Sequence, residues 1–243
     1  IREGLMVNEE EIPKKVKNLI ERIAPTKISD DEILDALQFL RNSGIVARLK
    51  AYRISHGPGD TALKESPNAK YVFTDPRYLI SAYLHEVHDL ESREYPSAFE
   101  EIYDIIKLVR MRMSGERTTT EEEKERFLGH YLESVTLANL TLGVYAMSVS
   151  DEHPDKSPRT DKYVRVLTLD ADAEVDAVLH LKERAAVLFE VSTRRKDDHV
   201  EKCNKAAEAA GASYCLYGTL DIQDVTIQGK TLMAPLPYAL LLF

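Results

Sequence analysis

The stretch Glu174–Ser192, EVDAVLHLKERAAVLFEVS, is typical of two adjacent β-strands joined by a turn. Asp176 lies early in the first expected strand, and Glu190 lies near the end of the second. Because neighbouring strands lie about 4.8 Å apart, carboxylates at matching ends of such a hairpin can meet at one divalent cation. Hard cations such as Mg²⁺ prefer oxygen ligands of this kind. The stretch therefore predicts a central hairpin and a candidate metal site.

Length and composition are those of an ordinary globular protein. The chain has 243 residues, of which 30% are charged and 44% hydrophobic, which fits one or two domains of about 100–200 residues each. No apolar run reaches the ~20 residues that span a bilayer, and the N-terminus has no secretory pattern. We therefore expect a cytoplasmic protein without membrane association. A chain that begins with Ile1 rather than Met suggests a fragment of a longer protein or trimmed numbering.

Charge and cysteine content narrow the classes of function. A net charge of -9 argues against a nucleic-acid binder that is basic all over, but it allows one basic face. Two cysteines, Cys203 and Cys215, are too few for a disulfide framework or a four-cysteine zinc site. We expect both thiols to be core or half-buried residues.

The first part of the chain predicts two helices and a hairpin. Residues 10–24 have helical periodicity, and Ser29 with Glu32 forms a capping box at the start of a second helix. Gly44 is a C-cap candidate. Residues 45–54 and 70–74 are expected strands, with the breaker-rich residues 55–68 as a loop between them.

This order of elements is typical of a winged helix, which we assign to residues 1–90. Arg48, Lys50 and Arg53 lie on the expected hairpin and are candidates for contacts with nucleic-acid phosphates. Packing of the same unit against a neighbouring domain is the alternative.

Residues 91–243 predict a second, α/β domain. Residues 96–113 and a segment from Thr120 onward are expected helices, and Glu133 adjoins the apolar stripe of the second helix. Three strands follow, of which the last two are the hairpin. The strand from Ala185, the helix 197–210 and the strand 214–217 form a βαβ unit, whose strands should be parallel.

A helix glutamate, Glu133, followed by Asp176 and Glu190 on adjacent strands, resembles the PD-(D/E)XK, or restriction-endonuclease-like, superfamily. The resemblance implies an α/β fold: an N-terminal winged helix followed by a restriction-endonuclease-like α/β/α domain with a mixed sheet. It also implies that Glu133, Asp176 and Glu190 are catalytic residues that bind Mg²⁺. In such sites the ion activates a water for phosphodiester hydrolysis.

The whole chain resembles the C-terminal region of a family of archaeal and bacterial AAA-type ATPases. The resemblance rests on FLRNSGIVARL, KYVFTDP, GHYLESV and EVDAVL…VLFEV, and on the ending MAPLPYALLLF, which fits an apolar C-terminal strand. No G-x-x-x-x-G-K-[ST] motif is present. The ATPase module is therefore absent from this sequence, and no ATP hydrolysis is expected of it.

The (D/E)-x-K motif departs from the superfamily pattern, because Ser192 stands where the lysine belongs. Arg194, Arg195 and Lys196 follow at once, and Lys202 and Lys205 lie on the next expected helix, from which one could reach back.

Three hypotheses follow from this departure. The prediction is a DNA-associated module with a degenerate metal site and weak or lost cleavage, in which Arg194, Arg195 and Lys196 meet the phosphate backbone. The first alternative is a non-catalytic protein-interaction or regulatory region of a larger ATPase. A stable homo-oligomer would favour this alternative. The second is an active Mg²⁺-dependent nuclease with a migrated lysine.

Overall fold

The computed structural model describes residues 7–23, 27–57, 60–75, 77–80, 95–114, 122–149, 164–169, 173–181 and 184–241. Its strands are β1 (Val7–Asn8), β2 (Val46–Gly57), β3 (Asp60–Phe73), β4 (Val164–Leu169), β5 (Ala173–Leu181), β6 (Arg184–Ser192), β7 (Tyr214–Thr219), β8 (Thr226–Gln228) and β9 (Thr231–Pro235). Its helices are α1 (Ile12–Ile23), α2 (Asp30–Asn42), α4 (Tyr95–Met113), α5 (Glu122–Val149), α7 (Asp197–Ala209) and α8 (Leu236–Leu240), with a 3-10 turn η1 (Glu9–Glu11).

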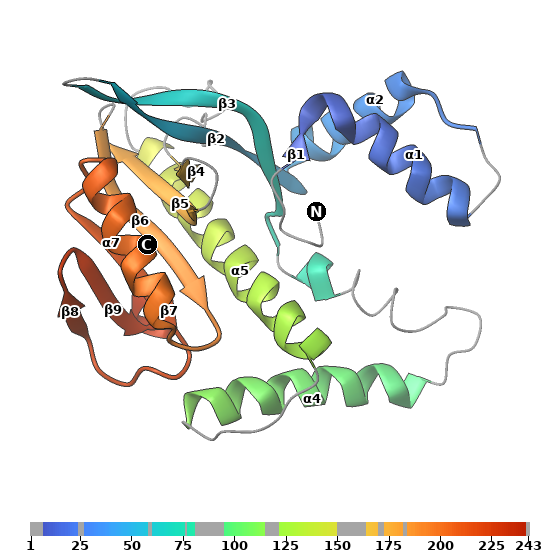
Figure 1. Ribbon diagram of the computed structural model, residues 1–243. Helices are drawn as coiled ribbons and strands as arrows, with labels where there is room; N and C mark the ends of the chain where they lie inside the picture. The colour runs from blue at the N-terminus through green and yellow to red at the C-terminus, as the bar shows by residue number, and fades with distance from the viewer. Residues whose placement is uncertain are drawn as a thin grey trace.

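The described strands form one sheet in the order β1-β3-β2-β4-β5-β6-β7-β9-β8. The sheet is mixed: β2 and β4, β6 and β7, and β7 and β9 are parallel neighbours, and the other pairs are antiparallel. Helices α5 and α7 lie on opposite sides of β5 and β6 (Figure 1). The predicted α/β class with a mixed sheet is confirmed, as are the hairpin and the parallel βαβ unit β6-α7-β7.

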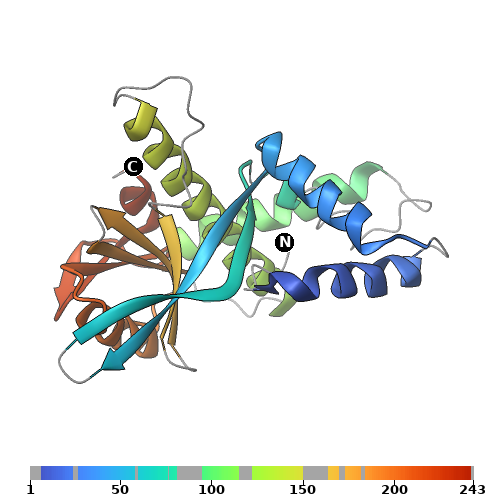
Figure 2. The same ribbon diagram turned by 90° about the horizontal axis from the view of Figure 1, so that it is seen from above.

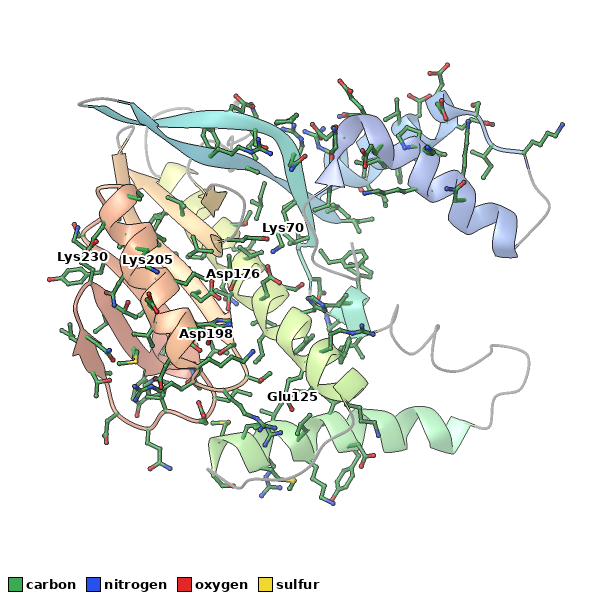
Figure 3. The ribbon with its side chains drawn as sticks, viewed as in Figure 1. Lys70, Glu125, Asp176, Asp198, Lys205 and Lys230 are labelled. Atoms are coloured by element: carbon green, nitrogen blue, oxygen red, sulfur yellow. The ribbon has the colours of Figure 1, made fainter. Side chains whose placement is uncertain are left out.

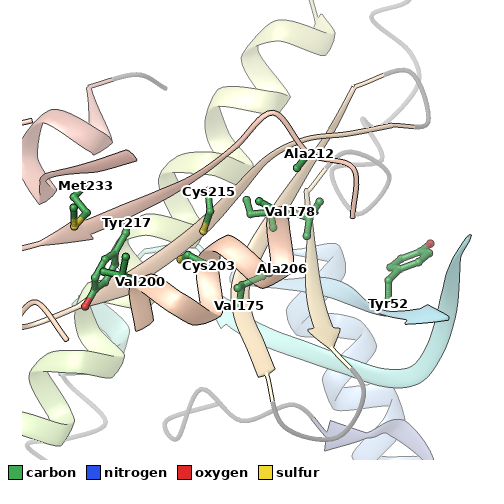
Figure 4. Close-up of a cluster of buried hydrophobic side chains, with 12 residues drawn as sticks. Tyr52, Val175, Val178, Val200, Cys203, Ala206, Ala212, Cys215, Tyr217 and Met233 are labelled. Carbon is green, nitrogen blue, oxygen red and sulfur yellow. The ribbon is translucent and has the colours of Figure 1, made fainter. Parts of the chain in front are cut away.

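Two apolar clusters hold these layers together. On the α7 side, Val200, Cys203 and Ala206 pack against strand residues that include Val175 and Val178 (Figure 4). On the α5 side, Leu137 and Leu140 pack against strand residues that include Ala177 and Phe189. Both cysteines are free and fully buried, as predicted. Burial of apolar surface on both faces accounts for the apolar sequence of β6.

The N-terminal helices lie at one end of the long β2–β3 hairpin (Figure 2). There Ile12 of α1 and Leu37 of α2 pack on Ala69 and Tyr71 of β3. Farther along, β2 pairs with β4 in parallel, so the hairpin belongs to the same sheet as the hairpin β5–β6. The expected boundary between residues 90 and 91 lies outside the described residues, but strands from both sides of it share this sheet.

Local signals in the N-terminal part were accurate at the helix ends. Ser29 and Glu32 form the predicted capping box, and Gly44 has a φ of 72°, which glycine adopts without strain.

The expected loop 55–68 was wrong, because β3 already begins at Asp60. The register explains how Pro67 is accommodated. Residues 66–68 of β3 lie opposite Ala51 alone, between the pairs Tyr52–Glu65 and Lys50–Ala69. An irregularity of this kind tolerates a residue that lacks a backbone N–H.

The C-terminal ending was predicted only in part. Residues 233–243 were expected to fit an apolar strand, but strand β9 ends at Pro235, and Leu236–Leu240 form the short helix α8. None of the described helices is both long and apolar enough to span a bilayer.

Candidate functional site

The β5–β6 hairpin brings Asp176 and Glu190 together. Ala177 pairs with Phe189 in the antiparallel register, which makes Asp176 and Glu190 the next facing positions. On its other side, β5 has two residues, Asp176 and Ala177, opposite the single residue Val166 of β4. This irregularity is a β-bulge, a feature that re-aims side chains and is common beside active sites. The two carboxylates predicted from the sequence are therefore neighbours.

Glu190 is almost completely buried, with 3% of its surface exposed. Lys202 donates from Nζ to Oε1 of Glu190 at 3.0 Å. His199 Nδ1 lies 2.7 Å from the same oxygen, although the two atoms are not aligned for a hydrogen bond. The second oxygen, Oε2, is buried and accepts no hydrogen bond from the residues that the structure describes. A buried carboxylate oxygen without a donor is costly, so this atom is a candidate ligand for a cation.

Asp176 is held beside Glu190 by the backbone. Its Oδ2 accepts the N–H of Val191 at 2.7 Å. Burial and the charge of Glu190 together raise the pKa of Asp176 to about 6, against the opposing charges of Lys70 and Lys202. Two carboxylates that share one site raise each other's cost of ionisation. The pKa of Asp176 is therefore raised first by burial and second by the like charge of Glu190.

Helix α7 brings a lysine and a histidine to Glu190. Lys202 lies one turn after His199, and both side chains reach Glu190 from above the sheet. Burial alone would lower the pKa of Lys202, but the charge and the hydrogen bond of Glu190 outweigh it, so that this pKa is raised and the ammonium stays charged. The sequence had identified Lys202 as one of several lysines able to reach back.

The Ser192 hydroxyl contacts the turn that follows β6. Its hydroxyl lies 2.7 Å from the hydroxyl of Tyr217 and donates to the carbonyl of Arg194. Tyr217 also donates to the Arg194 carbonyl at 3.0 Å and accepts from the backbone N–H of Lys196 at 3.1 Å. These bonds fix the turn between β6 and α7, which in turn sets where His199 and Lys202 lie.

Glu133, the third predicted carboxylate, is buried on α5 and is bound to a lysine. Lys70 of β3 donates to Oε1 of Glu133, and Lys70 Nζ lies 3.6 Å from Oε1 of Glu174. His130 Nδ1 lies 3.8 Å from Oε2 of Glu133. Within the described part of the chain, no three His, Cys, Asp or Glu side chains gather closely enough to hold a metal ion by themselves. The structure therefore brings Asp176 and Glu190 together and pairs Glu133 with Lys70.

Sequence reasoning missed Lys70 and His199. Lys70 follows Ala69 and precedes the apolar YVF, and the alternation of a strand places it on the same face as the buried Val72. A lysine on a buried face requires a partner, so this position carried a usable signal. His199 carried none, because its spacing from Glu190 depends on the geometry of the β6–α7 turn.

The basic residues predicted to touch nucleic acid fall into two groups. Four of them pair with acids: Arg48 with Glu9, Lys50 with Glu65 at 2.7 Å, Arg194 with Glu125 at 3.4 Å, and Arg195 with Asp197 at 3.2 Å. Arg53 and Lys196 have exposed side chains. Arg48 is the least available of the six, since only 18% of its side chain is exposed.

Glu125 of α5 anchors the turn that carries Arg194. It accepts from the buried Arg112 of α4 at 2.9 Å and from the hydroxyl of Thr193 at 2.6 Å. Burial would raise the pKa of Glu125, but these two hydrogen bonds and the nearby positive charges hold it below its usual value. The turn beside the carboxylate pair is thus fixed from the α5 side as well (Figure 3).

Comparison with protein-family models, with curated proteins and with solved structures gave no match. The site is therefore interpreted from its own geometry.

Proposed function

We propose that this chain is a metal-dependent phosphodiester hydrolase of the PD-(D/E)XK kind that acts on DNA, with Lys202 in place of the lysine missing at position 192. The observation that carries the proposal is the contact of 3.0 Å between Lys202 Nζ and Oε1 of the buried Glu190. It puts a fixed positive charge next to the two carboxylates, as the superfamily motif does with its own lysine.

The carboxylate pair fits a divalent cation such as Mg²⁺. Proteins commonly bind Mg²⁺ through only one or two carboxylates, and water and substrate phosphates complete the octahedron. Asp176 would offer one carboxylate, and Oε2 of Glu190 would offer a second oxygen, which accepts no hydrogen bond from the described residues. When bound, such an ion would lower the pKa of a coordinated water and offset charge on the phosphate oxygens.

The chain's own groups would orient the Asp176 carboxylate and offset negative charge at the site. Lys202 would keep a positive charge beside the attacking hydroxide, and the Val191 N–H would hold the Asp176 carboxylate in one orientation. The order α5, β4-β5-β6, α7, β7 supports a restriction-endonuclease-like core. The order α1, α2, β2-β3 supports a winged-helix unit, from which the exposed Arg53 could contact DNA phosphates.

Cleavage assays test this proposal. Labelled single- and double-stranded DNA is incubated with the chain in Mg²⁺ or Mn²⁺, and the same is done with Asp176→Asn, Glu190→Gln and Lys202→Gln. Removing one fixed charge from a metal-assisted site costs about 10²–10³-fold in rate. The cleavage rate of each variant should therefore fall at least ~100-fold. Lys202→Gln retains a donor for Glu190, and circular dichroism verifies that it folds.

Lys205→Gln is the matched control. Lys205 lies on the same helix, three residues beyond Lys202, but its side chain is 67% exposed and pairs with Glu201 (Figure 3). The cleavage rate of Lys205→Gln should stay within about twofold of that of the wild type. Absence of cleavage in both metals, or cleavage that survives all three site variants, would refute the proposal.

A second candidate is DNA binding without cleavage. It is favoured by the ion pair between Lys70 and Glu133, which leaves the third carboxylate of the superfamily engaged within the protein. This candidate predicts binding that weakens steeply with salt and that is unchanged in Asp176→Asn. Equal affinities for DNA at 50 and 200 mM salt would exclude it.

A further inference from the structure

Lys70 brings a positive charge into the carboxylate site from the N-terminal hairpin. Only 2% of its surface is exposed, and its ammonium contacts Glu133 of α5 and lies 3.6 Å from Glu174 of β5. Figure 3 shows Lys70 near Asp176, between the hairpin and α5. Buried lysines are almost always paired, and here the partner is the glutamate that the superfamily resemblance assigns to the metal.

Strand β3 has two faces with different neighbours. Ala69 and Tyr71 pack against α1 and α2, whereas Lys70 points toward α5, and Val72 joins the cluster that α5 covers. Successive residues of a strand alternate in this way. The ammonium of Lys70 is thus fixed between two residues that anchor the strand to the N-terminal helices, and the hairpin's position sets its distance from Glu133.

The charge of Lys70 also reaches Asp176, where it opposes the burial and the Glu190 charge that raise the pKa of that carboxyl. A cation bound at Asp176 and Glu190 would be repelled by this resident ammonium. Glu133 would not bind this cation either, because Lys70 pairs with it.

We infer that Lys70 is a positioning residue that competes with the metal: it holds Glu133 out of the ligand set and thereby makes metal affinity depend on the N-terminal hairpin. The inference rests on the proposed function. An ordinary buried ion pair would stabilise the fold and leave metal affinity unchanged, so affinity is the measurement that separates the two roles.

The experiment is titration of the full chain with Mn²⁺, followed by electron paramagnetic resonance of the free ion. Lys70→Met and Lys70→Gln both remove the positive charge. Lys70→Gln keeps a hydrogen-bond donor for the buried Glu133, so this variant should fold even if Lys70→Met does not. Loss of a unit charge a few ångströms away is worth at least ~10-fold in affinity at an effective dielectric constant of about 20. We expect both variants to bind Mn²⁺ at least ~10-fold more tightly, and Lys70→Arg to bind as the wild type does.

Two further variants sharpen the test. Adding Glu133→Gln to Lys70→Gln should remove part of the gain, because the freed carboxylate is then absent. Lys50→Gln is the matched control, since Lys50 lies on the same hairpin and pairs with Glu65, but in a more exposed position; its affinity should be unchanged.

The outcomes separate this inference from the proposed function. If the wild type binds Mn²⁺ and folded Lys70→Gln binds it equally well or more weakly, the role of Lys70 is refuted while the proposed function stands. If the wild type does not bind but Lys70→Gln does, Lys70 blocks the site, which supports the inference. If no variant binds Mn²⁺, both are overturned.

Discussion

Two ion-paired clusters in the same sheet differ in their charge balance. In the Glu9 cluster, Glu9 accepts from Arg48 and from the hydroxyl of Tyr71. In the Glu190 cluster, Glu190 and Asp176 face Lys202 and His199. The hydrogen bond from Arg48 outweighs burial and lowers the pKa of Glu9, whereas burial and a like charge raise that of Asp176 to about 6.

This difference distinguishes a structural cluster from a candidate site. The Glu9 cluster matches one carboxylate with one guanidinium and lies where water can reach it, since 35% of the Glu9 side chain is exposed. The Glu190 cluster concentrates two carboxylates, one of them with a buried oxygen that lacks a donor among the described residues. Carboxylates whose pKa is strongly perturbed, and which lie next to a specific charged partner, are typical of functional sites.

Removing the cation from each cluster should give the largest contrast. Lys202→Met leaves Glu190 buried without its ammonium partner, which should lower the free energy of unfolding by about 3 kcal/mol. Arg48→Met leaves a carboxylate that water can solvate, so the loss should be about 1 kcal/mol. Urea unfolding at pH 7 in the presence of EDTA measures both. Equal losses would mean that the two clusters have the same electrostatic character.

Removing a carboxylate from each cluster should change the free energy of unfolding in opposite directions. The pKa of Asp176 in the folded protein lies above its usual value of 3.8, so its ionisation costs stability as the pH rises from about 4 to about 6. Asp176→Asn can still accept from Val191 and should raise the free energy of unfolding at pH 7 by about 1–3 kcal/mol. The gain should disappear by about pH 4.

Glu9→Gln is the counterpart. Because the pKa of Glu9 is lowered, its contribution is present above the unfolded value of 4.5 and is lost as the pH falls through the folded pKa. This variant should therefore be less stable than the wild type at pH 7 and close to it in acid. Chemical unfolding between pH 3 and 7 measures both curves, and slopes of the same sign would contradict the comparison.

The smallest effect is expected at Ser192. Ser192→Ala removes the contacts of the hydroxyl with Tyr217 and with the Arg194 carbonyl, but Tyr217 keeps its own contacts with the Arg194 carbonyl and the Lys196 N–H, so the loss should be about 0.5–1 kcal/mol. Tyr71→Phe removes the hydroxyl that donates to Glu9 and should cost about 1 kcal/mol. Thermal unfolding followed by circular dichroism gives both values. A loss above about 2 kcal/mol at Ser192 would show that its hydroxyl holds more than the turn.

Local patterns were sufficient where one short stretch contains the physical cause. The capping box at Ser29, the glycine at the end of α2, the β5–β6 hairpin and the parallel βαβ unit are all set by residues near one another in sequence. Along α5, Leu128 and Leu132 are buried, whereas Leu142, which belongs to the same apolar periodicity, is 57% exposed. Periodicity identifies a helix face but does not identify which part of it is covered.

Where the sequence failed, the pairing between strands was the cause. Residues 60–68 contain turn-forming residues, yet they join β3 because β2 offers an antiparallel partner along its full length. Pairing of β2 with β4 likewise depends on chain segments more than 100 residues apart, as the pairs Ala51–Val166 and Ile54–Leu169 show.

The amino-acid order was sufficient to predict the hairpin and the facing positions of Asp176 and Glu190, which follow from the two-residue period of strands and from antiparallel register. It also shows directly that position 192 is a serine. Which cations meet those carboxylates depends on how distant elements pack. Lys202 comes from the crossover helix and Lys70 from the N-terminal hairpin, because charges taken out of water must find partners wherever packing brings them within reach.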